Sequence, residues 1–270
     1  MNLKKAPLFV GVLGLCTLSA FAQTPAPAPA PAPAPEATTG SWVFTPAVAS
    51  QYMFRGVRLG GPSFEPSIEY DYGALAAGVW SNVPLSAKVD GQSDPEFDFY
   101  GSYTVDLVKD TVSLAPGVTI YTYPSAKTSN GFYKATFEPN LALNYTVGAV
   151  KFTPKLYYDF VLKGPTAELT AAFAIPLKDA GTELDFTAVY GTYKWTSAAA
   201  DASPDVKNWG DYYLAGVSAP FQINKESKLT IGWAYTKGSS NFFKQGTAGK
   251  VANGAAVSRG VVTVSYAYTF

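Results

Sequence analysis

The chain has 270 residues, of which 15% are aromatic and only 15% carry a charge. A soluble domain has roughly 25% charged residues, so this composition is unusual for a surface that faces water. The mean hydropathy of +0.05 is nevertheless too low for a bundle of membrane helices, and no run of about 18 apolar residues follows the N-terminus. Alternating polar and apolar residues along strands give such an average, as in transmembrane β-barrels.

Charge and residue usage exclude several function classes. The formal net charge is zero, and removal of Lys4 and Lys5 with a leader leaves 18 basic and 20 acidic residues, a net charge of −2. No run of Lys and Arg marks a nucleic-acid-binding surface, so we expect no nucleic-acid partner. The chain has no histidine, and its single cysteine is Cys16. Without a Cys/His cluster, a Walker loop or a dinucleotide fingerprint, we expect no catalytic residue, no metal site and no cofactor.

Residues 1–22 are predicted to be a cleaved secretory signal peptide. Two lysines precede an apolar segment at 8–18, and Ala20-Phe21-Ala22 supplies the small residues of a cleavage site. The mature chain is then expected to begin at Gln23. The alternative is a lipoprotein signal acylated at Cys16, which the bulky leucine before the cysteine disfavours.

Residues 23–40 form a predicted Pro/Ala-rich linker, because prolines and alanines alternate through 24–35. Proline fixes φ and lacks an N–H, so the segment is expected to be an extended, polyproline-like spacer. We interpret it as a passive leader before the folded domain. A spacer that threads the peptidoglycan or binds a partner is the alternative.

The region 41–270 divides into segments of about ten residues with period-two alternation, the pattern of membrane strands. In Gly260–Phe270, for example, valines, tyrosines and phenylalanines alternate with threonines, serine and alanine. The expected fold is therefore all-β, a transmembrane antiparallel up-and-down barrel of about twelve strands. The strands are expected to begin near Trp42, Ser63, Leu75, Glu96, Thr111, Tyr133, Val150, Ala167, Glu183, Tyr212, Lys228 and Val257.

The connections between these segments alternate in length, which predicts short periplasmic turns and longer extracellular loops. Only Lys163-Gly164-Pro165 breaks the long series. Short connections are predicted at Tyr72–Ala74, Val108–Asp110, Gly148-Ala149, Lys178–Gly181 and Ile223–Ser227. Long ones are predicted at Gly56–Pro62, Leu85–Pro95, Tyr123–Phe132, Trp195–Asp211 and Gly238–Ala256.

A soluble β-sandwich or a lipocalin-like barrel is the competing fold. Its apolar core would have to exclude the ionisable groups that lie on one face of these strands, because an unpaired buried charge is costly. The chain also ends in an aromatic-rich strand with Phe270, the form that barrel-assembly machinery recognises. We therefore expect a protein of the cell outer membrane, with membrane lipid and that machinery as partners.

Three stretches resemble the TorF-type porin family of proteobacteria and their relatives. Ser50–Gly56 is similar to its S-x-Y-x-x-R-G opening, and Gly78–Val83 to its G-x-W-x-S-N hairpin. Glu96–Leu107, followed by Tyr121–Pro124, is similar to its E-x-D-x-Y-x-G-Y and Y-x-Y-P pair. The resemblance is strong in the first half of the barrel and general in the second. It implies a porin-like barrel and identifies no solute.

The polar positions of the strands predict a set of residues that line the lumen. Acidic groups outnumber basic ones, so a weak cation preference is expected. Arg55 is expected to end the first strand at the extracellular mouth and to pair with Glu69 or Asp71. The predicted pore-lining residues are Arg55, Glu65, Glu69, Asp71, Asp98, Asp106, Glu138, Lys151, Lys155, Asp159 and Asp185, with Lys134, Glu183 and Lys228 on the same face.

The function that these features favour is passive diffusion of small hydrophilic solutes or ions through the barrel. A barrel of about twelve strands lies between filled eight-stranded barrels and open porins, so a narrow channel and a plugged barrel are both compatible. A non-conducting structural or adhesive barrel is the alternative. A carboxylate-only enzyme is disfavoured, because the candidate acids recur at i, i+2, as lumen-facing strand positions do in any case.

Overall fold

The computed structural model describes residues 40–86, 94–128, 133–194, 209–238 and 259–270. The predicted signal peptide and almost all of the predicted linker lie outside these ranges. No helix among the described residues is long and apolar enough to cross a membrane.

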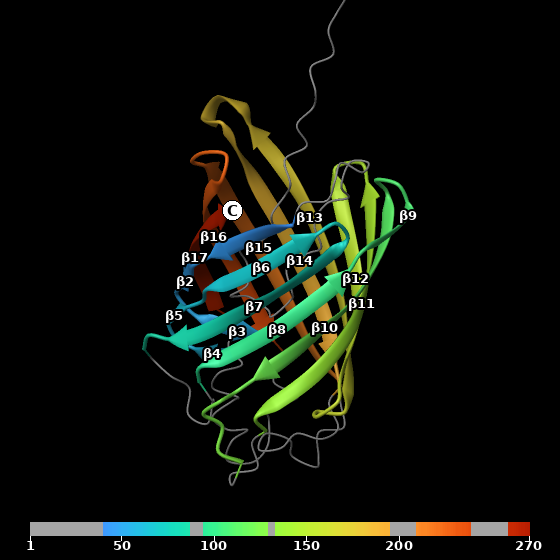
Figure 1. The fold of residues 1–270 in the computed structure, drawn as a ribbon, viewed down its shortest axis with the longest axis vertical. Helices are drawn as coiled ribbons and strands as arrows, with labels where there is room; N and C mark the ends of the chain where they lie inside the picture. The colour runs from blue at the N-terminus through green and yellow to red at the C-terminus, as the bar shows by residue number, and fades with distance from the viewer. Residues whose placement is uncertain (1–39, 87–93, 129–132, 195–208, 239–258) are drawn as a thin grey trace, which may run out of the picture.

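The described chain folds into β-strands and one short 3-10 helix (Figure 1). The strands are β1 (Ser41–Thr45), β2 (Ala47–Ala49), β3 (Tyr52–Phe54), β4 (Val57–Gly60), β5 (Ser63–Phe64), β6 (Ser67–Tyr72), β7 (Leu75–Pro84), β8 (Glu96–Tyr103), β9 (Val105–Val108), β10 (Val112–Thr122), β11 (Ala135–Val147), β12 (Val150–Asp159), β13 (Gly164–Leu177), β14 (Thr182–Tyr193), β15 (Gly210–Gln222), β16 (Ser227–Gly238) and β17 (Arg259–Thr269), with the 3-10 helix η2 at Lys178–Ala180.

The strands form a closed barrel of twelve antiparallel strands, which confirms the predicted fold class. Three barrel strands are interrupted, so β1 with β2, β5 with β6, and β8 with β9 each count as one. The first is broken at Pro46, which has no N–H for the ladder. The barrel closes where β1 pairs with β17, with Phe44 opposite Tyr268. Trp42 and Phe270 exchange two backbone hydrogen bonds there, of 3.0 and 2.9 Å, so the terminal aromatic residue lies in the seam.

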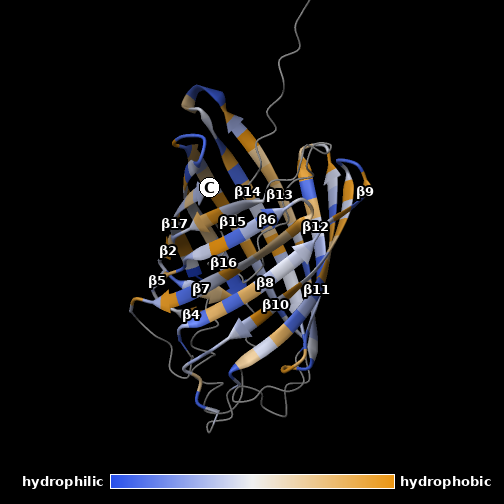
Figure 2. Ribbon diagram, in the orientation of Figure 1, coloured by the Kyte–Doolittle hydropathy of each residue, from blue (hydrophilic) through white to orange (hydrophobic). Residues whose placement is uncertain are grey.

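The strand faces are the reverse of those of a soluble barrel. Outward side chains are large and apolar: Leu141 is 44% exposed and Ile231 46% exposed. Their inward neighbours are polar, since Thr230 and Ser265 are 3% and 2% exposed. Figure 2 shows the resulting alternation of hydrophilic and hydrophobic residues along the strands. An apolar outer surface this extensive is suited to lipid, as in the predicted transmembrane arrangement.

Tight turns join the strands at one end of the barrel, which we call the short-turn end. Four of them contain a residue with positive φ, a conformation that glycine adopts without steric cost. Gly73, Gly148 and Gly181 have φ of 60°, 61° and 63°, and Asp110 has 58°. These turns lie where the sequence predicts them. The other end of the barrel is the long-loop end, and three of its predicted long loops fall largely outside the described residues.

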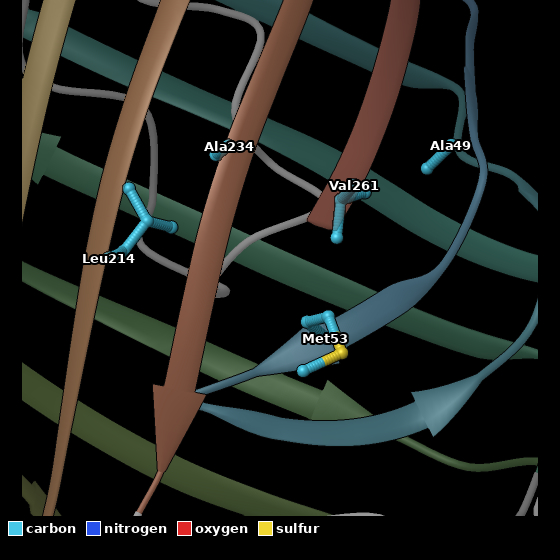
Figure 3. Packing of buried hydrophobic residues seen from close by; sticks show 5 residues of the cluster. All are labelled: Ala49, Met53, Leu214, Ala234 and Val261. Atoms are coloured by element: carbon cyan, nitrogen blue, oxygen red, sulfur yellow. The ribbon is translucent and has the colours of Figure 1, made fainter. Parts of the chain in front are cut away.

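The first connection at the long-loop end differs from the prediction. The sequence suggests that the first strand runs to Arg55, whereas the barrel strand ends with β2 at Ala49. The chain then forms a separate hairpin, β3–β4, which pairs only with itself among the described strands. Figure 1 shows this hairpin behind β7 and β8, and Figure 3 shows it between opposite walls of the barrel. We call residues 52–60 the lumen hairpin.

Candidate functional site

The lumen hairpin fills part of the barrel interior at the long-loop end. Its ladder pairs Tyr52 with Gly60 and Phe54 with Val57, and Arg55 and Gly56 form its tip. Both tip residues have positive φ, 46° for Arg55 and 77° for Gly56. A tight turn of this kind allows the tip to reach across the lumen to the opposite wall.

Arg55 is bound to the far wall through a bidentate ion pair. Its Nη1 donates to Oε1 of Glu138 at 2.9 Å, and its Nη2 donates to Oε2 at 2.8 Å. Tyr121 donates a third hydrogen bond to Glu138 Oε2 at 2.7 Å. Arg55 is 3% exposed and Glu138 is fully buried. Two parallel charge-assisted hydrogen bonds fix the orientation of both planar groups, so this pair sets the position of the hairpin tip.

Aromatic rings enclose the Arg55 guanidinium. Its Cζ lies 4.7 Å from the centre of the Phe54 ring and 4.9 Å from that of Tyr157. Phe54 in turn packs edge-on against Tyr121, with ring centroids 6.1 Å apart. A cation over an aromatic face is stabilised most where water is excluded, so the rings strengthen this anchor.

Apolar side chains of the hairpin pack against the other side of the barrel. Figure 3 shows Met53 among Ala49, Leu214, Ala234 and Val261, which together form one buried cluster. A second cluster joins Val57 of the hairpin with Leu162, Tyr193 and Tyr212 of the wall. At the tip, an added Cβ on Gly56 would lie 2.5 Å from the Cα of Gly238 on β16. The hairpin therefore contacts the wall around much of the lumen.

An acidic wall lies on the other flank of the hairpin. The phenol of Tyr52 donates to Glu96 Oε2 at 2.6 Å, and Ser63 donates to Glu65 Oε1 at 2.6 Å. Burial, followed by the charges of Glu96 and Asp98, raises the pKa of the Tyr52 phenol, which therefore stays protonated as a donor. Glu65, Glu96 and Asp98 are at most 3% exposed.

A network of tyrosines and carboxylates continues beyond Arg55. Tyr157 and Tyr212 donate to the two oxygens of Glu168, at 3.2 and 2.5 Å. Asp159 accepts from Thr136 at 2.7 Å and from the backbone N–H groups of the turn that follows it. These bonds fix the wall that receives the hairpin.

The short-turn half of the interior has a different character. Its inward positions include small hydroxylated and amide side chains, among them Ser113, Asn140, Asn144, Thr187 and Ser218. Several polar atoms of this half, including Asn140 Nδ2, Asp185 Oδ1 and Thr187 Oγ1, are buried with no protein partner. Unpaired groups of this kind are satisfied by water, so this half of the barrel is suited to hold water.

The predicted lumen residues are distributed over both halves. Glu65, Asp98, Glu138 and Asp159 lie at the level of the hairpin or next to it, and all are buried. Asp106 is exposed, in β9 near the short turns. Glu69, Asp71, Lys151 and Lys155 are half-buried and Asp185 is buried, all on inward positions of their strands.

The expected position and partners of Arg55 were wrong. Arg55 lies at the tip of the lumen hairpin, not at the end of the first barrel strand, and its partner is Glu138, not Glu69 or Asp71. The sequence interpretation also missed Glu96 and Glu168 as interior carboxylates. Strand periodicity could have found both, because Glu96 precedes Asp98 by two residues and Glu168 lies between the outward Ala167 and Leu169.

The described residues hold no group of three or more His, Cys, Asp or Glu side chains arranged to bind a metal ion. The inward polar residues, the apolar outer face and the closed twelve-stranded sheet define the fold of a transmembrane barrel of the outer-membrane porin type.

Comparisons with known proteins agree with this class. Residues 36–164 match the model of a family described as "Bacterial protein of unknown function (Gcw_chp)". No curated protein sequence matches the chain. Among solved structures, the KdgM porin in complex with disordered oligogalacturonate is similar with a TM-score of 0.51 and 12% identity, over 85% of this chain and 99% of that one. The NanC porin is similar with a TM-score of 0.51 and 11% identity, over 84% and 98%. Identities this low show a shared fold and nothing finer.

Proposed function

We propose that the protein is an outer-membrane channel for passive diffusion of small hydrophilic solutes or ions, with a weak preference for cations. The observation that carries this proposal is the polar, water-compatible interior of the short-turn half within a barrel of porin fold. In this assignment the short-turn end faces the periplasm and the lumen hairpin narrows the extracellular half. The proposed location implies export through a cleaved signal peptide and assembly through the C-terminal strand with Phe270. We also propose that the chain is related to the TorF-type porin family, because Ser50–Gly56, Gly78–Val83 and Glu96–Leu107 resemble motifs of that family.

The proposed cation preference follows from the carboxylates along the interior. Glu69 and Asp71 lie in β6, Glu65 lies just before it, and Asp98 lies in β8 on the other side of β7. Lys155 and Arg55 lie at the opposite side, where Arg55 is already paired with Glu138. A surplus of carboxylate attracts cations and repels anions. Such an interior disfavours anionic solutes, and oligogalacturonate, which the KdgM porin binds in its complex, is of that kind.

Single-channel recording in a planar bilayer tests the proposal. We expect discrete current steps and, in a salt gradient, a reversal potential shifted toward that of the cation. Asp98→Asn and Glu69→Gln are expected to reduce this shift, whereas Asp106→Asn, at an exposed position, is expected to leave it nearly unchanged. A reversal potential on the anion side would refute the cation preference.

A non-conducting structural or adhesive barrel is the second candidate, and the lumen hairpin favours it. The hairpin contacts both flanks of the lumen and the far wall, so a barrel in which it never moves would pass little current. Folded barrels that give no current steps, in the wild type and in every hairpin variant, would support this candidate over the channel.

A further inference from the structure

The lumen hairpin is held in the barrel differently from every other strand. All barrel strands are joined to two neighbours through backbone hydrogen bonds, whereas β3 and β4 form a two-stranded sheet of their own. Its base is attached to β17 at Ser50, whose N–H donates to Val262 O at 2.9 Å and whose Oγ accepts from the Val262 N–H at 2.9 Å. Within the base, Tyr52 N–H donates to Gly61 O at 3.2 Å. The described contacts between the hairpin and the far wall are made by side chains and by close packing at the tip.

The hairpin has the parts of a hinged unit. Its two strands pair with each other and with no other described strand. Its base joins the barrel through Ser50-Gln51 on one side and Gly60-Gly61-Pro62 on the other, and glycine pairs permit large changes of φ and ψ. The flanking segments β2 and β5 are fixed in the barrel sheet. Rotation about this base would move the hairpin without breaking any barrel ladder.

One polar contact dominates the attachment of the tip. Arg55 and Glu138 form a bidentate pair, and Tyr121 completes the coordination of the carboxylate. Met53 and Val57 add apolar contacts with the two buried clusters of the wall, and Tyr52 donates to Glu96 nearer the base. Loss of one partner from a buried ion pair leaves the other charge buried and unpaired, so removal of either partner is the single change that should weaken docking of the tip most.

We propose that the lumen hairpin is a gate, docked by the Arg55–Glu138 pair and able to swing out of the lumen as one body about its base at residues 50–51 and 60–62. A gating role depends on the proposed channel function. Docking and undocking of the hairpin can nevertheless be measured without recording current. The docked state is the structure described above. In the undocked state Val57 and Met53 leave their clusters, and the long-loop half opens to solvent.

Labelling of a single engineered cysteine measures the docking directly. The only natural cysteine, Cys16, lies in the predicted signal peptide, and the full-length parent chain serves as the blank. Val57→Cys places a small thiol at a position that is 3% exposed. Ser125→Cys, on an exposed loop at the same end, is the accessible reference. The chain is expressed in a Gram-negative host, purified from membranes in detergent and treated with a bulky water-soluble maleimide.

With the native pair, the Val57→Cys thiol is expected to react at least about tenfold more slowly than the Ser125→Cys thiol, because reaction requires local opening. When Arg55→Ala or Glu138→Gln is added to Val57→Cys, we expect the labelling rate of the Val57→Cys thiol to rise about tenfold. A modest loss of docking free energy changes the population of the undocked state by this ratio. Glu69→Gln, which removes an interior carboxylate away from the hairpin, is the matched control and should leave the slow rate unchanged. Resistance of the barrel to unfolding in detergent before heating confirms that each variant is folded.

The outcomes separate the gate from the channel. Unchanged labelling in both folded pair variants, or fast labelling with the native pair, overturns the gate whatever the current does. Faster labelling in both variants supports the gate, and if no variant conducts, the channel function fails while the gate stands. If Arg55→Ala does not fold, Glu138→Gln, which keeps the shape of the side chain, decides alone.

Discussion

Arg55 and Glu138 show how one buried pair connects distant parts of the chain. They are 83 positions apart, and each is surrounded by side chains that exclude water. The free energy of a buried ion pair is a small difference between desolvation and attraction, so the pair as a whole adds little stability. Removal of one partner is much more costly than removal of both, and this asymmetry can be measured.

We predict that Arg55→Ala and Glu138→Gln each lower the free energy of unfolding. Each single loss should exceed half of the loss that the double variant shows. The cost of Arg55→Ala, which strands the Glu138 carboxylate, is expected to be about 3–5 kcal/mol. Chemical unfolding in lipid vesicles, followed by tryptophan fluorescence, measures each value. The double variant should be less destabilised than the sum of the single variants. Strict additivity would mean that the two groups do not interact in solution.

Gly56 offers a second prediction at a single residue. Its φ is +77°, and an added Cβ would lie 2.5 Å from the Gly238 Cα, so Gly56→Ala suffers both backbone strain and a clash with backbone. Gly148 also has positive φ, +61°, but an added Cβ there meets nothing within 4 Å. We expect Gly148→Ala to cost about 1–2 kcal/mol from φ alone, and Gly56→Ala to cost more. Equal losses in unfolding experiments would show that the hairpin tip is not seated against β16.

At the scale of elements, the sequence was sufficient for the barrel strands and their short turns. Period-two alternation, as in Val262, Val264 and Tyr266, fixes which face of a strand meets lipid. Residues such as Gly148 and Gly181 mark turns because they tolerate positive φ. Both signals are local, and the barrel follows from their repetition in an antiparallel order. The predictions for the signal peptide, the linker and three of the long loops fall on residues that lie mostly or wholly outside the described ranges.

The lumen hairpin could not be predicted by the same means, because its position depends on contacts distant in sequence. Arg55 could pair with any interior carboxylate, and no local pattern selects Glu138 over Glu69. One clue was present: Val57 and Leu59 place apolar side chains in the predicted first loop, Gly56–Pro62, which was expected to extend into water. Burial of such side chains is favourable, and the lumen is the nearest place for it.

A deletion tests the hairpin as an element. Replacement of residues 52–60 by a short Gly/Ser linker removes every hairpin contact and leaves the flanking strands β2 and β5 in place. We expect the shortened barrel to fold and to conduct several times more current per channel than the wild type, because the lumen is then wider at the long-loop end. Planar-bilayer recording measures the step size. Unchanged steps would show that the hairpin does not limit the passage of ions.

At the scale of the whole molecule, the arrangement of faces is inverted relative to a soluble protein. Ionisable groups such as Glu65, Asp98 and Glu168 are inside, and aromatic and aliphatic groups cover the outside. Hydrophobic burial within the protein therefore contributes little to the barrel wall. The outer face gains its favourable free energy from contact with lipid instead, while the closed sheet satisfies the backbone hydrogen bonds that lipid cannot.

This inversion predicts a depth-dependent penalty for charge on the outer face. Ile231, in the middle of β16, is 46% exposed, and Leu177, at the end of β13 beside the short turn, is 36% exposed. In a membrane barrel Ile231→Arg should cost about 2–4 kcal/mol, whereas a residue near the interface should cost about 0–1 kcal/mol. Folding titrations into lipid vesicles give both values. If the surface faced water, the two arginines would be tolerated equally, because an exposed position in water accepts a charge wherever it lies along the strand.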